Sequence, residues 1–217
     1  MSQPSWKTVP WEDNPSAKEP FEYLIDILCD VAGHLEDMKA IPNQQEIVSR
    51  ELLAERVALS LNELDNWWSG WIAANPHACD EIQSTSDSTV MVDDDGPLFP
   101  TILRYSSLSV AYLVCTHNCG RILLLYVLRC LDILAVDRPS ANNESGISDN
   151  TTTQPLLGIC SNSISLAHEV LRSLDYCFEQ AGGFMGSLCV MVLQNEKYEA
   201  LDPVSREAAW LQRKDMT

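Results

Sequence analysis

The stretch from Phe21 to Met38, FEYLIDILCDVAGHLEDM, decides the fold class of this chain. Its apolar residues recur at steps of three and four, which is the spacing of one face of an α-helix. These residues are Phe21, Leu24, Ile25, Leu28, Val31, Ala32, Leu35 and Met38. Ahead of them, Ser16 and Glu19 have the spacing of a capping box, with Pro20 in the first turn. We therefore predict an amphipathic helix that ends before Pro42.

A second apolar stripe follows at helical spacing and runs into a tryptophan-rich end. It consists of Leu53, Val57, Leu61, Leu64, Trp68 and Trp71. Only a short break that contains Pro42 separates the two stripes. Because short connections join helices that pack side by side, the two helices are expected to form a helical hairpin.

Two polar stretches interrupt the helical patterns. Residues 75–97 read NPHACDEIQSTSDSTVMVDDDGP, and residues 138–155 read RPSANNESGISDNTTTQP. Both are rich in Ser, Thr, Asp and turn-forming residues, and neither has a helical period. We predict that both are solvated loops.

Residues 98–137 and residues 167–178 carry the next two helical patterns. Gly182 and Gly183 follow the second of these and are typical of a helix end. No segment combines strand alternation with hairpin turns, and no longer sequence period repeats. The middle of the chain is therefore expected to be helical, without a sheet.

The C-terminal part begins with an apolar segment at residues 184–201. Asp202 and Pro203 then resemble the N-cap and first turn of a last helix that runs through Trp210. Together the patterns predict an all-α fold, a single helical bundle of about six helices. The predicted organisation is one domain over residues 1–217, with an N-terminal arm at 1–17 and polar loops at 75–97 and 138–155.

Composition limits the possible functions. The 217 residues suffice for one domain with a sizeable core, and 46 % hydrophobic with 21 % charged residues is ordinary for a folded chain. The 31 acidic and 14 basic side chains give a net charge of −17. Because affinity for phosphate backbones depends on Lys and Arg, we expect no direct binding of nucleic acid by this chain.

The cellular location is suggested by what the sequence lacks. The start, MSQPSWKTVPWEDNPSAKEP, has no basic segment followed by an apolar core, so we expect no secretory signal. The longest apolar stretch, Ile122 to Val136, contains Arg129 and Asp132 and falls short of the ~20 residues that span a bilayer. We expect an intracellular protein without a membrane segment, in which the eight cysteines are reduced thiols.

Three cysteines and a histidine lie close together in VCTHNCGRILLLYVLRC, from Val114 to Cys130. On a helix, Cys115, Cys119 and Cys130 share one apolar stripe, whereas His117 is turned ~200° from Cys115. Cys130 is also about three turns away along the axis, too far to share one metal ion with the others. The stretch predicts buried, inert thiols and no metal site.

Two further constellations resemble catalytic sites without meeting their geometry. In SNSISLAHE, residues 161–169, the residues Asn162, Ser165 and Glu169 approach the magnesium-binding pattern of class I terpene cyclases, but the first step is three residues instead of four. Ser165 with His168 and Asp175 suggests a triad, but no nucleophile elbow accompanies it. We predict no catalytic residue, no cofactor and no metal, and read the acidic run 93–95 as part of a solvated loop.

The tryptophans of LDNWWSGW, residues 64–71, cannot all face one core. Trp68 and Trp71 fall on the apolar stripe, whereas Trp67 is turned ~100° from Trp68. One ring is therefore expected at a domain surface or pocket rim, where large aromatic residues often contact a partner or ligand. Packing under the adjoining loop is the alternative. Trp67, Trp68 and Trp71 are our candidate partner or ligand contacts.

Several stretches together resemble the fungal-specific transcription factor domain, the helical regulatory region of fungal zinc binuclear cluster regulators. The resemblance covers about Trp6 to Trp210 and rests on WKTVPWED, FEYLIDILCDVAGHLEDM, LSLNELDNWWSGW and the segment from Ala167 to Gln212. In the last of these, Gly183 and Gly186 form a Gly-x-x-Gly turn. The six closely spaced cysteines of the family's basic DNA-reading module have no counterpart here.

The resemblance implies the regulatory half of such a protein without its DNA-binding half. We expect a non-enzymatic domain that binds a protein partner or a small-molecule effector. The family implies residence in the nucleus and control of transcription, often of gene clusters for secondary metabolism. Apart from the resemblance, we expect a cytoplasmic protein that is not secreted. The alternative is a stand-alone isomerase or cyclase on the same scaffold. An enclosed pocket with a tryptophan, a histidine and a carboxylate would favour that enzyme, and a filled core would favour the regulator.

Overall fold

The computed structural model describes residues 12–14, 17–41, 47–85, 92–93, 95–133, 162–181, 193 and 205–214. Among these residues the chain forms five helices and two small two-stranded sheets. The helices are α1 (Pro20–Ala40), α2 (Ile47–Ala74), α3 (Leu108–Ile133), α4 (Ser163–Ala181) and α6 (Arg206–Lys214). The strands are β1 (Cys79–Gln83), β2 (Val92–Asp93), β3 (Gly96–Pro97) and β4 (Thr101–Tyr105). The predicted helical fold class is confirmed.

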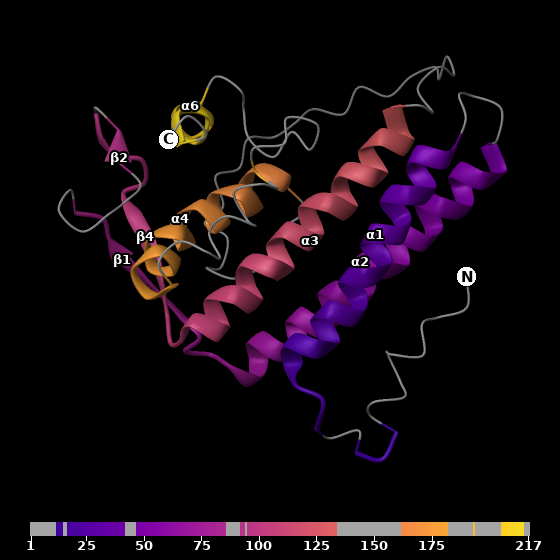
Figure 1. Cartoon of the computed structure of the whole chain (residues 1–217), viewed down its shortest axis with the longest axis horizontal. Helices are drawn as coiled ribbons and strands as arrows, with labels where there is room; N and C mark the ends of the chain where they lie inside the picture. Colours follow the sequence, from indigo (N-terminus) through magenta and orange to yellow (C-terminus); the bar gives the residue numbers. More distant parts are fainter. Residues whose placement is uncertain are drawn as a thin grey trace, which may run out of the picture.

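The helices α1 and α2 form the predicted antiparallel hairpin and lie side by side along their length (Figure 1). The start of α1 differs in detail from the prediction. The carboxylate of Glu22 accepts a hydrogen bond of 2.7 Å from the backbone N–H of Glu19. This capping pair lies three residues later than the predicted pair of Ser16 and Glu19, because Glu19 is itself the N-cap. Ser16 lies outside the described residues.

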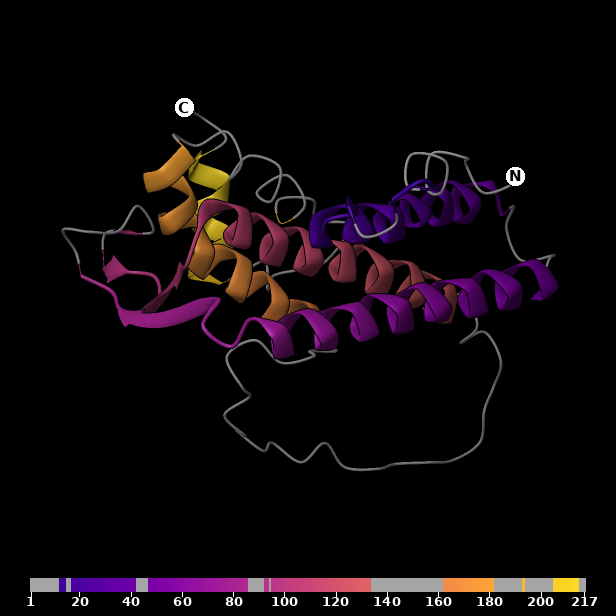
Figure 2. The same ribbon diagram turned by 90° about the horizontal axis from the view of Figure 1, so that it is seen from below.

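The helix α3 is the central element of the bundle. It contacts α1 and α2 on one side and α4 and β4 on the other (Figures 1 and 2). The segment Leu108–Leu131 is long and apolar enough to span a membrane, but 61 % of its most apolar window is buried inside the protein. A helix buried on several sides in a bundle needs the same composition as a membrane span.

A sheet occupies part of the chain where we predicted a loop and then a helix. β1 pairs antiparallel with β4, so that Cys79 lies opposite Tyr105 and Ile82 opposite Ile102. The predicted loop at 75–97 is therefore wrong in part. The long helix predicted within residues 98–137 is confirmed as α3, which begins at Leu108, after β4. Five-residue strands are too short to show a clear period, and in β1 only Cys79 is buried.

Asp93 and Asp95, the described residues of the acidic run 93–95, lie within a tight hairpin. Val92 pairs with Pro97 and Asp93 with Gly96, and Gly96 has a φ of 106°, which favours glycine. Asp93 is also paired with Arg206 on α6, with 2.8 Å between Nε and Oδ2. Asp93, which we predicted in a solvated loop, therefore links the small sheet to the last helix.

The two C-terminal helices agree with the predicted positions to different degrees. α4 contains the predicted pattern, and its apolar residues Leu166, Val170 and Leu174 are buried. The helix α6 begins at Arg206, and the Ser205 hydroxyl accepts a hydrogen bond of 3.2 Å from the N–H of Ala208. Ser205 thus caps the helix, in place of the predicted start at Asp202 and Pro203.

Three predicted segments lie wholly or mostly outside the described residues. They are the polar loop 138–155, the arm 1–17 and the apolar segment 184–201.

Candidate functional site

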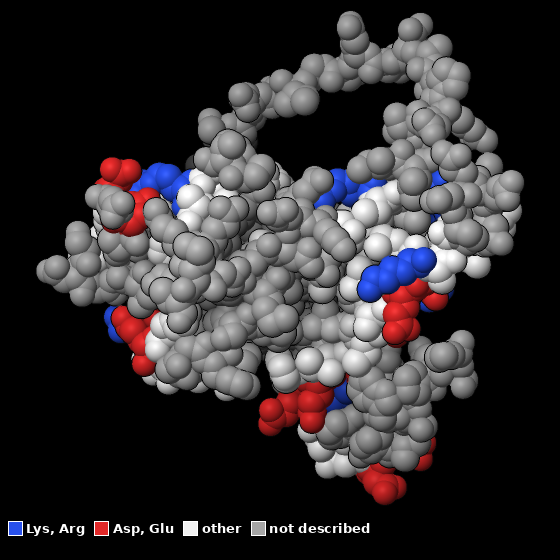
Figure 3. Space-filling model, turned by 45° about the horizontal axis from the view of Figure 1, so that its top comes forward, with Lys and Arg blue, Asp and Glu red and all other residues white. Residues whose placement is uncertain are grey.

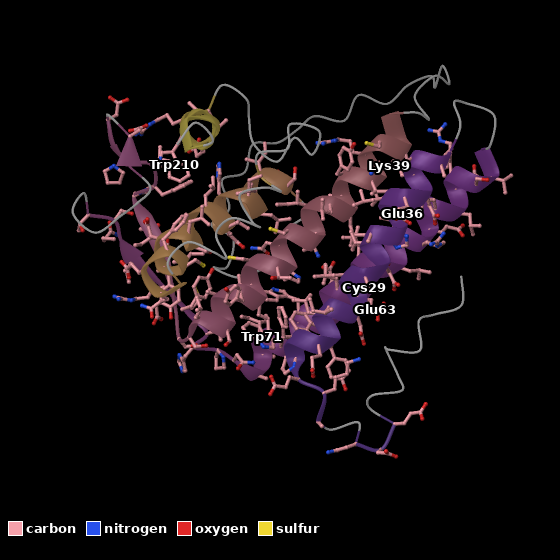
Figure 4. The ribbon with its side chains drawn as sticks, viewed as in Figure 1. Cys29, Glu36, Lys39, Glu63, Trp71 and Trp210 are labelled. Atoms are coloured by element: carbon pink, nitrogen blue, oxygen red, sulfur yellow. The ribbon has the colours of Figure 1, made fainter. Side chains whose placement is uncertain are left out.

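The three candidate tryptophans form one cluster near the C-terminal end of α2, where Figure 4 labels Trp71. Trp68 and Trp71 are 2 % and 8 % exposed, as their stripe predicts, with ring centroids 5.2 Å apart. Trp67 stacks on Trp71, with 6.4 Å between ring centroids and 13° between ring planes. Residues four apart on a helix are neighbours, so Trp67 joins the cluster and is half-buried at its edge. It does not stand alone at a surface.

The structure adds His117 to this cluster, which the sequence analysis missed. The imidazole is 2 % exposed and lies against Trp68, with 4.2 Å between ring centroids and 17° between planes. We predicted that His117 faces away from the core side of Cys115. Because neighbouring elements cover α3 on more than one side, both residues are buried, in different directions. Burial lowers the pKa of His117 to about 4, so the ring is neutral at pH 7.

Asn118 links the histidine to a carboxylate on α4. Its side-chain oxygen lies 3.1 Å from Nδ1 of His117, and its amide nitrogen donates a hydrogen bond of 3.0 Å to Oε2 of Glu169. Since the amide oxygen can only accept, Nδ1 of the neutral histidine carries the proton and Nε2 is the acceptor. Nε2 is buried and has no hydrogen-bond partner within the described part of the chain.

Glu169 is the titratable end of this chain of hydrogen bonds. Burial raises the pKa of its carboxyl group to about 7, and the hydrogen bond from Asn118 and the charge of Arg172 oppose the rise. The backbone of Glu169 is also engaged, because its carbonyl accepts a hydrogen bond of 2.6 Å from the Ser173 hydroxyl. Ser173 in turn lies 2.6 Å from the Tyr105 hydroxyl on β4. As the single proton of Ser173 goes to that carbonyl, Tyr105 is the donor to Ser173.

An ion pair lies one helical turn from His117. Arg121 on α3 is paired with Asp65 on α2, and the arginine side chain is almost completely buried. The charged pair therefore lies in the same α2–α3 interface as the tryptophans. Buried pairs of this kind are costly to break, since the remaining charge is left without a partner.

The predicted thiol stripe is buried over only part of its length. Cys115 and Cys119 are 2 % and 9 % exposed, as predicted. Cys130 is half-buried, because it lies in the last turn of α3, near the edge of the bundle. Cys79 on β1 is buried, and burial raises the pKa of its thiol to about 12. Within the described ranges, no group of three or more His, Cys, Asp or Glu side chains has metal-binding geometry.

The residues that resembled a magnesium site or a triad have separate roles. Asn162 caps α4, with its side-chain oxygen accepting a hydrogen bond of 2.9 Å from the N–H of Ile164. His168 packs edge-on against Phe99, with 5.6 Å between their ring centroids, and Asp175 is buried. Glu169 points to Asn118 on α3. Neither constellation forms a site.

A second candidate site is the outer face of α2, which we define by the exposed apolar residues Val48, Leu52 and Leu59. They are 77 %, 56 % and 68 % exposed. Their steps of four and seven place them within ~40° of one another around the helix, opposite the buried stripe. The exposed carboxylates of Glu51, Glu55 and Glu63 lie on the same side of the bundle. The apolar stripe of the predicted helix contains none of these three residues, so the sequence pattern did not predict this face.

On the face shown in Figure 3, the acidic side chains of the described residues are not gathered in a single patch. In the view of Figure 3, those of the described residues form small separate groups, several of them beside basic side chains. Three such pairs are Arg56 with Asp37, Arg172 with Glu81 and Arg206 with Asp93.

Comparison with known proteins does not place the chain in a family. No family model, no curated protein and no solved structure matches it. The resemblance to the fungal-specific transcription factor domain therefore stays a prediction from sequence.

Proposed function

We propose that this chain is a helical regulatory-type domain without its own DNA-binding module, which acts by binding a partner protein through the outer face of α2. In line with the sequence resemblance, we propose that it works in the nucleus, in the control of a fungal metabolic gene cluster. The net charge of −17 supports the absence of direct DNA contacts.

The observation that carries the proposal is the exposure of Val48, Leu52 and Leu59 on one line of α2. Large apolar side chains are scattered singly on most protein surfaces, whereas an aligned set marks a contact site more often. Full burial of an exposed Val or Leu side chain contributes about 1.5–3 kcal/mol, and each of these partly exposed side chains would contribute a share of that when a partner covers it. The opposite stripe of the same helix already holds α2 in the bundle, so the outer face is not needed for the fold.

A tethering experiment tests the proposal. The chain is fused to an unrelated DNA-binding module in yeast, and expression of a reporter gene under the matching promoter is measured. We expect the fusion to change reporter expression by several fold, and Leu52→Ser combined with Leu59→Ser to abolish the change. Ile164→Ser is the matched control, because Ile164 is an exposed apolar residue on α4. A double variant that is as active as the original fusion contradicts the proposed role of this face.

A second candidate function has an observation in its favour. The structure brings Trp68, His117 and, through Asn118, Glu169 together, which is the combination that we expected of an isomerase or cyclase site. Against it, Trp68 and His117 are each 2 % exposed and pack directly on each other. This filled arrangement supports the regulator.

A titration separates the two candidates. Tryptophan fluorescence of the purified chain is measured against a set of small apolar metabolites, with His117→Phe as the variant. Saturable quenching that this variant loses would favour the enzyme or an effector site in the core. We expect no saturable change, since the rings occupy the site themselves.

A further inference from the structure

We propose that the partner that binds the outer face of α2 contributes an amphipathic helix whose apolar side chains are flanked by Lys and Arg. This inference rests on the proposed function and names the chemical class of the partner. It follows from the geometry of the apolar line, from the charges beside it and from what those charges exclude.

The apolar line has the dimensions of a helix-binding face. From Val48 to Leu59 it extends about 16 Å along α2, which is three turns. A partner helix presents its own apolar residues at steps of three, four and seven over the same length. Leu52 lies between the two ends, so three contacts can form along one partner helix without a bend in either element.

The charges beside the line are acidic. Glu51 and Glu55 lie on one flank at ~60–100° from Leu52, and Glu63 lies one turn beyond Leu59. None of these three carboxylates is in an ion pair with another described residue. Arg56 lies on the other flank, where its guanidinium is 2.7 Å from Asp37 on α1 and is thus neutralised locally. A partner with basic flanks complements this face.

The same charges disfavour two other occupants. In a symmetric dimer through this face, Glu51 and Glu55 of one copy would approach the acidic flank of the other, and each copy carries a net charge of −17. An anionic membrane surface attracts basic segments and would repel this one. A basic helix is the occupant that gains from both the apolar line and its flanks.

Synthetic peptides test the inference on the intact chain. The probe is a fluorescent amphipathic peptide of about 18 residues, with leucines on one face and lysines on its flanks. A second peptide keeps the leucines and has glutamates on the flanks, and a third keeps the lysines and has serines in place of the leucines. Binding is measured by fluorescence anisotropy at about 0.15 M salt, where charges separated by more than ~8 Å are screened.

The protein variants separate apolar contact from charge. Leu52→Ser with Leu59→Ser removes the apolar line, and Ile164→Ser is its control. Glu51→Lys with Glu55→Lys reverses the flank. Its control is Asp80→Lys with Glu179→Lys, which changes the net charge equally at exposed positions on β1 and α4. Circular dichroism checks that each variant is folded.

We expect the first peptide to bind at least about tenfold more tightly than the other two, a difference typical of complementary charge and apolar contacts. Each α2 double variant should weaken that binding by at least about tenfold, and neither control should change it more than about twofold. Equal weakening by the Asp80 and Glu179 control would overturn the inference, because it would show attraction by net charge alone.

Other outcomes distinguish this inference from the proposed function. Two results would overturn the inference of a basic partner helix and keep the outer face of α2 as a contact site. One is tighter binding of the glutamate-flanked peptide. The other is a dimer in sedimentation that dissociates in the Leu52→Ser, Leu59→Ser variant. Loss of folding in the Leu52 and Leu59 variant overturns both, since the face would then be covered by the chain itself.

Discussion

At the scale of single residues, burial shifts the pKa values of His117 and Glu169 in opposite directions. Asn118 links the two side chains by hydrogen bonds. Burial lowers the pKa of His117 from 6.5 to about 4, so its contribution to stability is present above pH 6.5 and is lost as pH falls through 4. Burial raises the pKa of Glu169 from 4.5 to about 7, so its contribution is present below pH 4.5 and is lost as pH rises through 7. Between about pH 4.5 and 6.5 the two effects on stability oppose each other.

Replacing the carboxylate should remove one of these two effects. In Glu169→Gln, the free energy of unfolding should equal that of the original chain near pH 4.5 and exceed it by about 3 kcal/mol above pH 7, from ~1.4 kcal/mol per pKa unit. The reason is that glutamine keeps the acceptor for Asn118 and cannot ionise. Urea unfolding across this pH range measures the difference. Glu179→Gln, an exposed change on the same helix, is the control, and parallel pH profiles of the original chain and Glu169→Gln would contradict the prediction.

Replacing the histidine should have the opposite pH dependence. His117→Phe keeps a ring against Trp68 but leaves the side-chain oxygen of Asn118 without its donor, which costs about 1–3 kcal/mol at pH 7. That deficit should shrink as pH falls from 6.5 to 4, because in this range the original chain gains a proton on His117 only when it unfolds, and the variant has no such group. Urea unfolding measures it, with His77→Phe at an exposed position as the control. A deficit that grows in acid would show that His117 is not buried in its neutral form.

Thiol labelling should rank the cysteines by their position in the bundle. We expect an alkylating reagent to modify Cys29 first, Cys130 more slowly, and Cys79, Cys115 and Cys119 only on the time scale of unfolding. Burial both blocks access and, for Cys79, raises the pKa of the thiol. Mass spectrometry of labelled peptides over time gives the order, and labelling in urea gives the unprotected rates. Rapid labelling of Cys115 in the folded protein would contradict the buried position of the thiol stripe.

At the scale of elements, a glycine on α3 lies against a leucine side chain of α1. A Cβ atom at Gly120 would overlap the end of the Leu28 side chain, whereas a Cβ at Gly33 on α1 would meet open space. The end of the Leu28 side chain on α1 occupies the space that a side chain at Gly120 would take. Sequence analysis had assigned no role to Gly120, because a glycine within a helical pattern does not reveal which neighbour approaches it.

Alanine substitutions should separate this contact from helix propensity. Gly33→Ala should stabilise the protein by about 0.5–1 kcal/mol, because alanine favours the helix. Gly120→Ala should stabilise it less than Gly33→Ala does, because the end of the Leu28 side chain must move to admit the Cβ atom and this cost offsets part of the gain in helix propensity. Thermal unfolding measures both. In a double-mutant cycle, Leu28→Ala should relieve the cost of Gly120→Ala, and strict additivity would show that the two residues do not meet.

The elements also differ in how well the sequence predicted them. The stripes of α1, α2 and α4 extend over many turns, so their period is visible and their helices were placed correctly. β1 and β4 were missed because each has only five residues and gains its stability from pairing with a strand far along the chain. The observed caps Glu19 and Ser205 each lie a few residues from the predicted caps. Several neighbouring residues near a helix end can act as a cap, so the sequence locates the end only approximately.

At the scale of the whole molecule, the charge of −17 determines how the chain behaves toward polyanions. We expect no binding of duplex DNA by the purified chain at about 50 mM salt, where counterion release favours any protein with a basic surface. Fluorescence anisotropy of a labelled duplex measures this, with a basic DNA-binding protein as the positive control. Saturable binding that weakens with added salt would contradict both the expectation from net charge and the proposal that this chain makes no direct DNA contacts.

The sequence alone determined that the chain forms amphipathic helices, that two of them pair as a hairpin and that Trp68 and Trp71 face the core. These properties follow from the order of apolar residues along one helix, which is local information. Only the tertiary structure decided that α3 is covered on more than one side and that His117 meets Trp68 on α2 and, through Asn118, Glu169 on α4. Asn118 and Glu169 are 51 positions apart. Their contact depends on the packing of two helices, which no pattern within either helix specifies.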